Sequence, residues 1–333
     1  MSRVTLKDVA KKADVSYQTV SKVVNGKAFV TEATEARIWD AIRELDYQPN
    51  IAARNLRKQS SNMIGFSWSP GDALNPIIDR FLYSITKQMR QEGYYILMFP
   101  RDISHGGSFR DLYQTKQVSG YILTSTNHND ERVAELLEQE IPFASFGRAN
   151  DAWNFNWVDI DGKHGIDLVM DHLIANGHRK IALFTWPEGS QAGEAREAGY
   201  FGKLAANGIA INSEYVWRID GSVESGYLAA QELVRKDAAD RPTAIVCVND
   251  MIAIGAMNCI TAVGLEVGKD LAVTGFDNVP MTEFLNPPLT TVQQPIEEAG
   301  KLVADMMLAQ LGRKKVEPKQ TLLLPELVIR SSA

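Results

Sequence analysis

The chain has 333 residues, of which 45% are apolar and 23% charged, and its formal net charge is -6 at pH 7. At roughly 100 to 200 residues per domain, this length predicts two or three domains. No run of about 18 uninterrupted apolar residues could cross a bilayer, and the first residues lack the apolar segment of a secretory signal. We therefore expect a cytoplasmic protein without membrane contact.

Cysteine and histidine usage argues against a metal site. The two cysteines, Cys247 and Cys259, are too few for a disulfide framework or a four-ligand zinc site. The five histidines are scattered along the chain at spacings that do not suit joint metal ligation. We expect no metal and no other cofactor.

The charge is unevenly distributed along the chain. Residues 1–60 hold 11 Lys or Arg against 7 Asp or Glu, whereas the remaining residues hold 24 against 34. A basic N-terminal segment therefore precedes an acidic body. Such asymmetry is typical of proteins whose basic part contacts nucleic acid.

The N-terminal segment begins with two short helical patterns separated by a tight turn. Thr5, followed three residues later by Asp8, predicts the start of a first helix over about residues 6–13. Ser16 can cap a second helix, which we expect to end near Asn25-Gly26.

The outer face of this second helix carries side chains suited to reading DNA. Tyr17, Gln18, Ser21 and Lys22 share one face, and we expect them to point to solvent. Gln can bond adenine bidentately, and Lys can bond guanine O6 and N7, near the start of a helix that fits the major groove. The alternative is an ordinary solvated polar face.

Two further helices are predicted before the body begins. Thr31 caps the third, which ends before Pro49 because the residue preceding a proline leaves the helical region. Asn50 can cap a fourth, and its residues include Ala53, Arg54, Leu56, Arg57 and Lys58. Two turns make this fourth helix marginal in isolation.

From Met63 onward, short apolar runs alternate with helical patterns. The runs are IGFSW, YYILMF, GYILT and PFASF, followed after WVDI by KIALFT, VWRI, TAIVCV and LAVTGF. This order predicts parallel sheets, and the two similar halves predict two doubly wound lobes. One large continuous sheet is the less favoured alternative, because so many strands exceed what an open sheet usually carries.

Ligands of doubly wound folds bind at the carboxyl ends of the strands. The residues at those ends include planar hydrogen-bonding groups and aromatic rings, as a sugar site requires. They are Trp68, Ser69, Arg148, Trp186, Asn249, Asp250, Phe276 and Asp277. For Asp250 and Asp277, helix capping is the alternative role.

The N-terminal motifs resemble those of the lactose and galactose repressor family of bacterial transcription regulators. They are VTLKDVAKKADVSYQTVSKVVNG and LDYQPNIAARNLRKQSS. The resemblance implies that the second helix reads operator bases and that the fourth is a hinge helix, which inserts Leu56 into the minor groove and kinks the DNA. Lys22 replaces an arginine found in some members. The predicted DNA contacts are Thr5, Ser16, Tyr17, Gln18, Ser21, Lys22, Asn25, Asn50, Ala53, Arg54, Leu56 and Arg57.

The resemblance continues through the body to about Arg330, with marks such as GHRKIALF, VCVNDMIAIGAM and VTGFDN. It implies a body similar to periplasmic sugar-binding proteins, with an effector held between the lobes. Gly147 departs from the aspartate common at its position. The predicted effector contacts are Trp68, Ser69, Asn75, Arg148, Trp186, Arg196, Asn249, Phe276 and Asp277.

These expectations combine into an α/β chain with three parts. We predict a helix-turn-helix head over residues 1–48, a hinge helix and linker over 49–61, and a two-lobed, periplasmic-binding-protein-like body over 62–333. Lobe one is expected at about 62–160 with 291–320, and lobe two at about 161–290 with 321–333.

The leading hypothesis is a homodimeric repressor that binds near-palindromic operator DNA under control of a small carbohydrate. A purine or protein corepressor is an alternative, and so is a transport binding protein or a sugar-modifying enzyme with a regulatory head. No catalytic residues are predicted, because the chain lacks G-x-S-x-G, H-E-x-x-H and phosphate-loop motifs.

Overall fold

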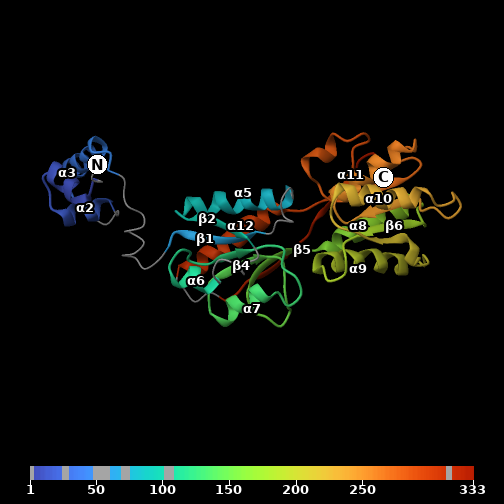
Figure 1. Cartoon of the computed structure of the whole chain (residues 1–333), viewed down its shortest axis with the longest axis horizontal. Helices are drawn as coiled ribbons and strands as arrows, with labels where there is room; N and C mark the ends of the chain where they lie inside the picture. Colours follow the sequence, from blue (N-terminus) through green and yellow to red (C-terminus); the bar gives the residue numbers. More distant parts are fainter. Residues whose placement is uncertain (1–3, 25–29, 48–60, 69–75, 101–108, 313–316) are drawn as a thin grey trace. The chain divides into compact units, whose positions relative to one another are not determined.

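The computed structural model describes residues 4–24, 30–47, 61–68, 76–100, 109–312 and 317–333. The chain divides into two compact units, residues 1–60 and residues 61–333. We call the first the head and the second the body (Figure 1). The predicted hinge helix lies outside the described residues.

The described part of the head contains the three helices expected from the sequence. They are α1 (Leu6–Lys12), α2 (Tyr17–Val24) and α3 (Glu32–Glu44). Val9, Val20 and Ile38 are fully buried, one from each helix, and together they form the centre of a small apolar core. Apolar residues at helical spacing thus account for the packing of all three helices.

Lobe one of the body is a six-stranded parallel sheet in the order β11-β5-β4-β3-β1-β2. Its strands are β1 (Met63–Trp68), β2 (Tyr95–Pro100), β3 (Tyr121–Leu123), β4 (Phe143–Phe146), β5 (Asn156–Ile160) and β11 (Gln320–Leu323). Helices α5 (Pro76–Gln91) and α12 (Ile296–Leu311) cover one face. Helices α6 (Phe109–Gln114) and α7 (Glu131–Glu138) cover the other (Figure 1).

Lobe two repeats this architecture with the strand order β12-β10-β9-β8-β6-β7, and only its edge strand β12 is antiparallel to its neighbour among these described strands. The strands are β6 (Ile181–Thr185), β7 (Val216–Arg218), β8 (Ala244–Cys247), β9 (Ala272–Asp277), β10 (Thr290–Gln293) and β12 (Glu326–Val328). Strands β6, β8 and β9 are buried along their whole length, as expected for near-continuous apolar runs in a sheet covered on both faces.

Helices pack in pairs against the sheet of lobe two. One pair is α8 (Gly162–Ala175) with α9 (Gln191–Ala206), and the other is α10 (Val223–Val234) with α11 (Asp250–Ala262). A Cβ atom on Gly255 of α11 would lie 2.0 Å from the carbonyl oxygen of Val223. Glycine at this position therefore permits the close approach of α10 and α11.

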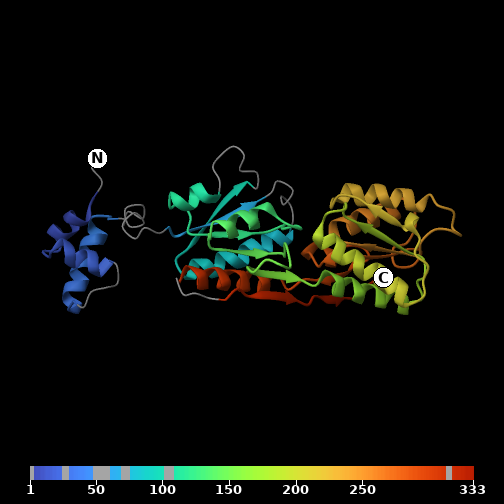
Figure 2. The same ribbon diagram turned by 90° about the horizontal axis from the view of Figure 1, so that it is seen from below.

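The chain passes between the lobes three times, after β5, after β10 and after β11 (Figure 2). The second and third crossings therefore lie about three residues later in the chain than the predicted lobe boundaries at 290/291 and 320/321. Strand β10 pairs with β9 of lobe two, and β11 pairs with β5 of lobe one. Strand pairing decides the exact crossing point, and apolar periodicity alone does not reveal it.

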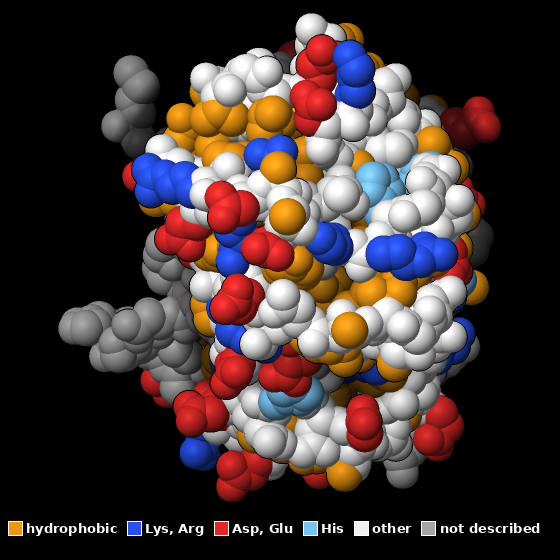
Figure 3. Space-filling view, turned by 90° about the vertical axis from the view of Figure 1, so that its right-hand side faces the viewer, with side chains coloured by type: hydrophobic (Ala, Val, Ile, Leu, Met, Phe, Trp, Pro, Cys, Tyr) orange, Lys and Arg blue, Asp and Glu red, His pale blue; other side chains and the backbone are white. Residues whose placement is uncertain are grey.

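No helix among the described ranges combines the length and apolar character needed to span a membrane. On the end of lobe two seen in Figure 3, acidic and basic side chains are interspersed. This face of the body carries no continuous basic surface among the residues described there, in agreement with the acidic composition of the body.

Candidate functional site

The second helix of the head presents part of the predicted reading face. Ser16 begins α2 as expected, since its Oγ accepts a hydrogen bond from the Thr19 backbone N–H at 3.1 Å. Gln18 and Lys22, one helical turn apart, are both exposed. Tyr17 and Ser21 are only half-exposed, and Tyr17 packs against the head core. The expectation that all four point to solvent is therefore wrong for Tyr17, because its ring gains more by covering the core.

The start of the first helix is also as predicted. The Thr5 backbone N–H and hydroxyl both donate to Asp8 Oδ2, at 2.8 and 2.7 Å. These bonds lower the pKa of Asp8 below its usual value, with the bond from the Thr5 side chain the largest cause. The remaining predicted DNA contacts lie outside the described residues. They are Asn25, Asn50, Ala53, Arg54, Leu56 and Arg57.

The body contains a cavity of about 700 Å³ whose wall draws on both lobes. Lobe one contributes the residues that follow β3 and β4 and the start of α5. Lobe two contributes the residues that follow β6 and β8, the last residue of β9 and the start of α9. The cavity therefore lies where the carboxyl ends of the strands meet helix N-termini, as in other doubly wound folds.

Arg196 of α9 is the central charged group of this cavity. Its side chain is buried, and its guanidinium lies 3.7 Å from the ring centroid of Phe276 and 4.9 Å from that of Trp186. Nη1 donates to the carbonyl oxygen of Val248, whereas Nε has no hydrogen-bond partner among the described residues. Burial lowers the pKa of Arg196, and the negative charge of Asp277 opposes this effect. This N–H is buried, with almost no accessible surface, so its lack of a partner adds to the cost of burying the guanidinium.

Asp277 lies on the same wall at the end of β9. Its carboxylate accepts a hydrogen bond from Gln294 Nε2 at 2.5 Å. Burial raises the pKa of Asp277, and the positive charge of Arg196 partly offsets the rise. A buried carboxyl group beside a buried guanidinium offers both acceptors and donors to a polar ligand.

On the lobe-one side, Arg148 forms an ion pair with Asp159, its Nε lying 2.8 Å from Oδ2. Both residues line the cavity. Since each charge of this pair is compensated by the other, the lobe-one wall offers hydrogen-bonding groups without net charge.

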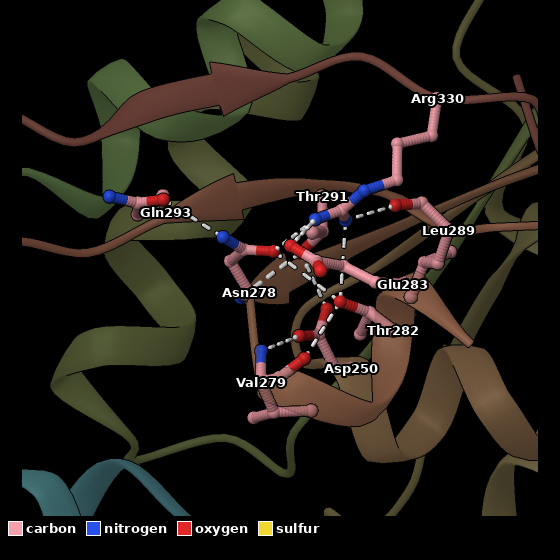
Figure 4. A network of polar contacts seen from close by, with 9 residues as sticks. All are labelled: Asp250, Asn278, Val279, Thr282, Glu283, Leu289, Thr291, Gln293 and Arg330. Carbon is pink, nitrogen blue, oxygen red and sulfur yellow. Dashed lines mark hydrogen bonds and ion pairs between the residues drawn. The ribbon is translucent and has the colours of Figure 1, made fainter. Parts of the chain in front are cut away.

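Asp277 and Asn278 have positive φ angles of 126° and 49°, in a region that favours glycine. Figure 4 shows the polar network that holds the adjoining turn. Asp250 accepts hydrogen bonds from the Val279 backbone N–H at 2.8 Å and from Thr291 Oγ1 at 2.5 Å. Arg330 Nη2 donates to Asn278 Oδ1 at 2.9 Å. A strained backbone of this kind persists only where the surrounding contacts fix it. Here the fixed turn places Asp277 on the cavity wall.

Burial raises the pKa of Asp250 to about 6, and its bond from Thr291 is the largest opposing effect. The proposed capping role is wrong for both aspartates. Asn249 caps α11 instead, since its side chain accepts from the Ile252 backbone N–H at 2.8 Å. Asn249 Nδ2 also donates to the carbonyl oxygen of Gly221 at 3.0 Å. Asp250 holds the turn after β9, and Asp277 lines the cavity.

The structure brings together five of the predicted effector contacts around one cavity. They are Arg148, Trp186, Arg196, Asn249 and Asp277. The prediction that Phe276 contacts the effector is wrong. Its side chain is fully buried, does not line the cavity and instead packs against the Arg196 guanidinium. Side chains alternate across a strand, so Phe276 and Asp277 cannot both face the ligand. The side chain of Trp68, together with Ser69 and Asn75, lies outside the described part.

Several residues of the cavity wall were not predicted. The polar ones are Ser125, Thr126, Asp159, Gln191, Asp220, Ser222 and Gln294. Thr126 and Gln294 follow β3 and β10, so the rule that ligands bind at carboxyl ends of strands could have found them. Gln191 lies at the start of α9, and Asp220 lies before α10. No sequence signal marks these two.

Among the ion pairs of the described residues, His128–Glu194 joins the two lobes directly. Nε2 of His128, after β3, lies 2.8 Å from Oε2 of Glu194, on α9. This hydrogen bond lowers the pKa of Glu194. Both side chains are half-exposed, so the pair adds little stability. No cluster of His, Cys, Asp or Glu suited to a metal ion occurs in the part of the chain described.

The fold and cavity define a class of protein with a helix-turn-helix head and a two-lobed, ligand-binding type of body. Residues 5–50 match the family described as bacterial regulatory proteins, lacI family, and residues 170–333 match the periplasmic binding protein-like domain. The chain is 31% identical to the HTH-type transcriptional repressor PurR of Aliivibrio fischeri, over 98% of both chains.

Solved structures agree with this match. The lac repressor dimer bound to operator and the anti-inducer ONPF has a TM-score of 0.87 at 30% identity, covering 99% of each chain. The complex of the transcriptional regulator CelR with cellobiose has a TM-score of 0.74 at 29% identity, covering 99% of this chain and 100% of the other. The chain belongs to the lacI family of bacterial regulatory proteins and is a DNA-binding transcriptional repressor.

The raised pKa of Asp277 makes a prediction about stability. An unfolded aspartate titrates near pH 4, so the folded protein favours the protonated form, and the stability it contributes falls as the pH rises above about 4. Asp277→Asn cannot titrate. Its free energy of unfolding, relative to wild type, should therefore increase between pH 4.5 and 8 by at least about 1.4 kcal/mol, the equivalent of one pKa unit.

Urea denaturation at several pH values measures this difference. Asp151→Asn, at an exposed carboxylate, is the matched control and should give a constant difference. A constant difference for Asp277→Asn as well would mean that Asp277 keeps its charge in the folded protein.

Proposed function

We propose that this repressor acts as a homodimer whose operator affinity is controlled by a small carbohydrate bound between the lobes. The observation that carries the proposal is the cavity wall itself. Arg196, Asn249 and Asp277 supply planar hydrogen-bonding groups, and Trp186 supplies an aromatic surface. A volume of about 700 Å³ is typical of small-molecule sites.

The charge balance of the cavity favours an uncharged, hydroxyl-rich ligand. The charged residues described along the wall are Arg148, Arg196, Asp159, Asp220 and Asp277. Arg148 is paired with Asp159, and Arg196 lies near the buried carboxyl group of Asp277, whose pKa is raised. Hydrogen bonds from Ser222 lower the pKa of Asp220 and keep it ionised. The two arginines thus face Asp159 and Asp220 even when Asp277 is protonated, so the wall offers no net positive charge to an anionic ligand.

The alternative of a purine effector rests on the Trp186 ring, because a base could stack on it as well as a sugar can. The cellobiose bound by the similar regulator CelR supports the carbohydrate proposal. Coupling between effector and operator is typically about 1 to 3 kcal/mol and is reciprocal.

In the head, Gln18 and Lys22 are proposed to read adenine and guanine in each half-site. Leu56 is proposed to enter the minor groove, as the family resemblance implies. Phosphate contacts by the basic head make operator affinity strongly dependent on salt.

A dimer is supported by large apolar side chains that remain exposed in both lobes. Lobe one exposes Tyr83 on α5 and Tyr95 and Met98 on the edge strand β2. Lobe two exposes Met281 and, at 85%, Phe284. Exposed aromatic groups of this size beside an unpaired strand edge are typical of protein interfaces.

The effector proposal predicts a ligand-dependent change in Trp186 fluorescence. The panel consists of neutral mono- and disaccharides including cellobiose, the matching uronic acids, and purine bases and nucleosides. A neutral sugar should change both the emission and the operator affinity, whereas Trp186→Phe should abolish most of the emission change. A response confined to purines would replace the carbohydrate proposal, and a preference for uronic acids would contradict the charge balance.

Lys22→Ala should weaken binding to the preferred operator by about 5- to 150-fold, corresponding to about 1 to 3 kcal/mol for a bidentate base contact. Binding to unrelated DNA should change much less. Fluorescence anisotropy at fixed salt measures both. Lys12→Ala is the matched control, because Lys12 forms an ion pair with Glu44 at 2.7 Å. An equal loss on specific and unrelated DNA would assign Lys22 to the phosphate backbone.

Phe284→Asp should shift the protein from dimer to monomer and reduce operator affinity, because a charge would replace an apolar contact at the interface. The exposure of Phe284 means that folding of the monomer should be unaffected. Ile211→Asp, at another exposed apolar residue, should leave the dimer intact. Sedimentation equilibrium distinguishes these results, and an unchanged dimer in Phe284→Asp would exclude this residue from the interface.

A further inference from the structure

A contact outside the cavity wall joins the two lobes. His128 belongs to the loop between β3 and α7 of lobe one, and Glu194 lies in the first turn of α9 of lobe two. Nε2 of His128 lies 2.8 Å from Oε2 of Glu194, and neither residue lines the cavity. The distance between these two atoms depends on how the lobes are arranged. The pair therefore favours the arrangement seen in this structure.

The loop that contains His128 is fixed to lobe one by a buried ion pair. Asp130 and Arg132 are 7% and 8% exposed, and Nη2 of Arg132 lies 2.7 Å from Oδ2 of Asp130. Arg132 Nη2 also donates to the carbonyl oxygens of Thr124 and Ser125, at 3.1 and 3.3 Å. These buried groups would lose their partners if the loop moved, so His128 is presented from a fixed position. The charges of Asp130 and Arg132 compensate each other.

Glu194 is held on lobe two by a second hydrogen bond. Its Oε1 accepts from the Gly189 backbone N–H at 3.3 Å, and its Oε2 is the atom that faces His128. Arg196, which lines the cavity, follows two residues later on the same helix. Movement of α9 relative to lobe one would therefore change both the distance between His128 and Glu194 and the width of the cavity.

The strength of the contact depends on the charge of the imidazole. The hydrogen bond from His128 is the largest cause that lowers the pKa of Glu194, and the charge of Arg218 also lowers it. Arg218 is itself paired with Glu197, and its Nε lies 3.6 Å from Oε1 of Glu188. Arginine and glutamate side chains keep their charge between pH 6 and pH 8, whereas histidine side chains titrate near pH 6.5. Among these groups, only the imidazole changes its charge in this range.

The sign of the effect follows from the two forms of the contact. At pH 6 a charged imidazole faces a carboxylate, whereas at pH 8 a neutral ring does, and the charged form of such a bond is the stronger. Both side chains are half-exposed, and an exposed ion pair changes an equilibrium by about 1.5- to 5-fold. A change of this size redistributes lobe arrangements that differ little in free energy.

We propose that His128 and Glu194 form a pH-sensitive latch between the lobes, which holds the arrangement seen here more firmly at pH 6 than at pH 8. A ligand that contacts both lobes binds this arrangement, so uptake of the proton and binding of the ligand strengthen each other. The repressor thereby responds to pH as well as to its effector. The latch needs no ligand, so it does not depend on whether the effector is a carbohydrate.

Spin labels on the two lobes test the latch in the full-length protein without a ligand. Cysteines replace Glu138 on α7 and Ala206 on α9, which are exposed, whereas the native Cys247 and Cys259 are buried and should remain unlabelled. Pulsed electron paramagnetic resonance then measures the distances between the lobes. The ratio of molecules in the arrangement seen here to all others should be about 1.5- to 5-fold higher at pH 6 than at pH 8.

His128→Gln and Glu194→Gln each remove one charge and keep hydrogen-bonding groups at the same position. In both variants, the difference between pH 6 and pH 8 should disappear. His178→Gln is the matched control and should keep the wild-type difference, because Nδ1 of His178 contacts Thr243 Oγ1 within lobe two, at 2.9 Å. Equal distance distributions at both pH values in wild type would overturn the proposal. So would a difference that persists in His128→Gln and Glu194→Gln.

Ligand affinity supplies the second readout, measured with the panel compound that changes Trp186 emission most. Burial raises the pKa of Asp277 to about 8, so the cavity itself titrates in this range, and wild type must be compared with His128→Gln. The gain in affinity from pH 8 to pH 6 should be about 1.5- to 5-fold larger in wild type. Equal gains would overturn the link between latch and ligand. If no sugar of the panel binds, the carbohydrate proposal fails, while the distance measurement still decides the latch.

Discussion

The three crossings between the lobes are the constraint on which the body depends. The chain crosses after β5, β10 and β11, and each lobe is completed by a segment that returns from the other. The carboxyl ends of both sheets border the same cavity. A polar ligand can therefore contact strand ends of both lobes at once, while the three connections restrict how the lobes can move. Recognition and lobe movement are coupled by this topology.

Within that frame, one buried arginine organises the cavity. Arg196 packs against the Phe276 ring, lies near the buried carboxyl group of Asp277 and has no hydrogen-bond partner for Nε among the described residues. Asp277 in turn depends on a turn with positive φ angles that Asp250 and Arg330 hold in place. Burying these polar and charged groups costs free energy that apolar side chains at the same positions would not cost. Retention of such groups in a cavity is typical of a binding site, where a ligand completes the hydrogen bonds.

Local patterns were sufficient for the architecture but not for every side chain of the site. Helix starts at Thr5, Ser16 and Thr31 follow from short-range hydrogen bonds, and the apolar runs predict the strands. The rule for carboxyl ends of strands located Asn249 and Asp277. It did not separate Asp277 from Phe276, because that distinction depends on which residue of the strand faces inward. Residues on helix starts and loops, such as Gln191, enter the cavity only through tertiary packing, which leaves no local pattern.

The position of the cavity between the lobes suggests how a ligand could act on them. Arg148 belongs to lobe one and Arg196 to lobe two, and both line the cavity, so a ligand that contacts both favours arrangements in which both reach it. A ligand shifts an equilibrium only by its difference in affinity between the two states. Contacts confined to one lobe would contribute equally to both arrangements, whereas contacts that span the cavity would not. Residues that bridge the lobes through the ligand should therefore affect regulation more than those that only increase affinity.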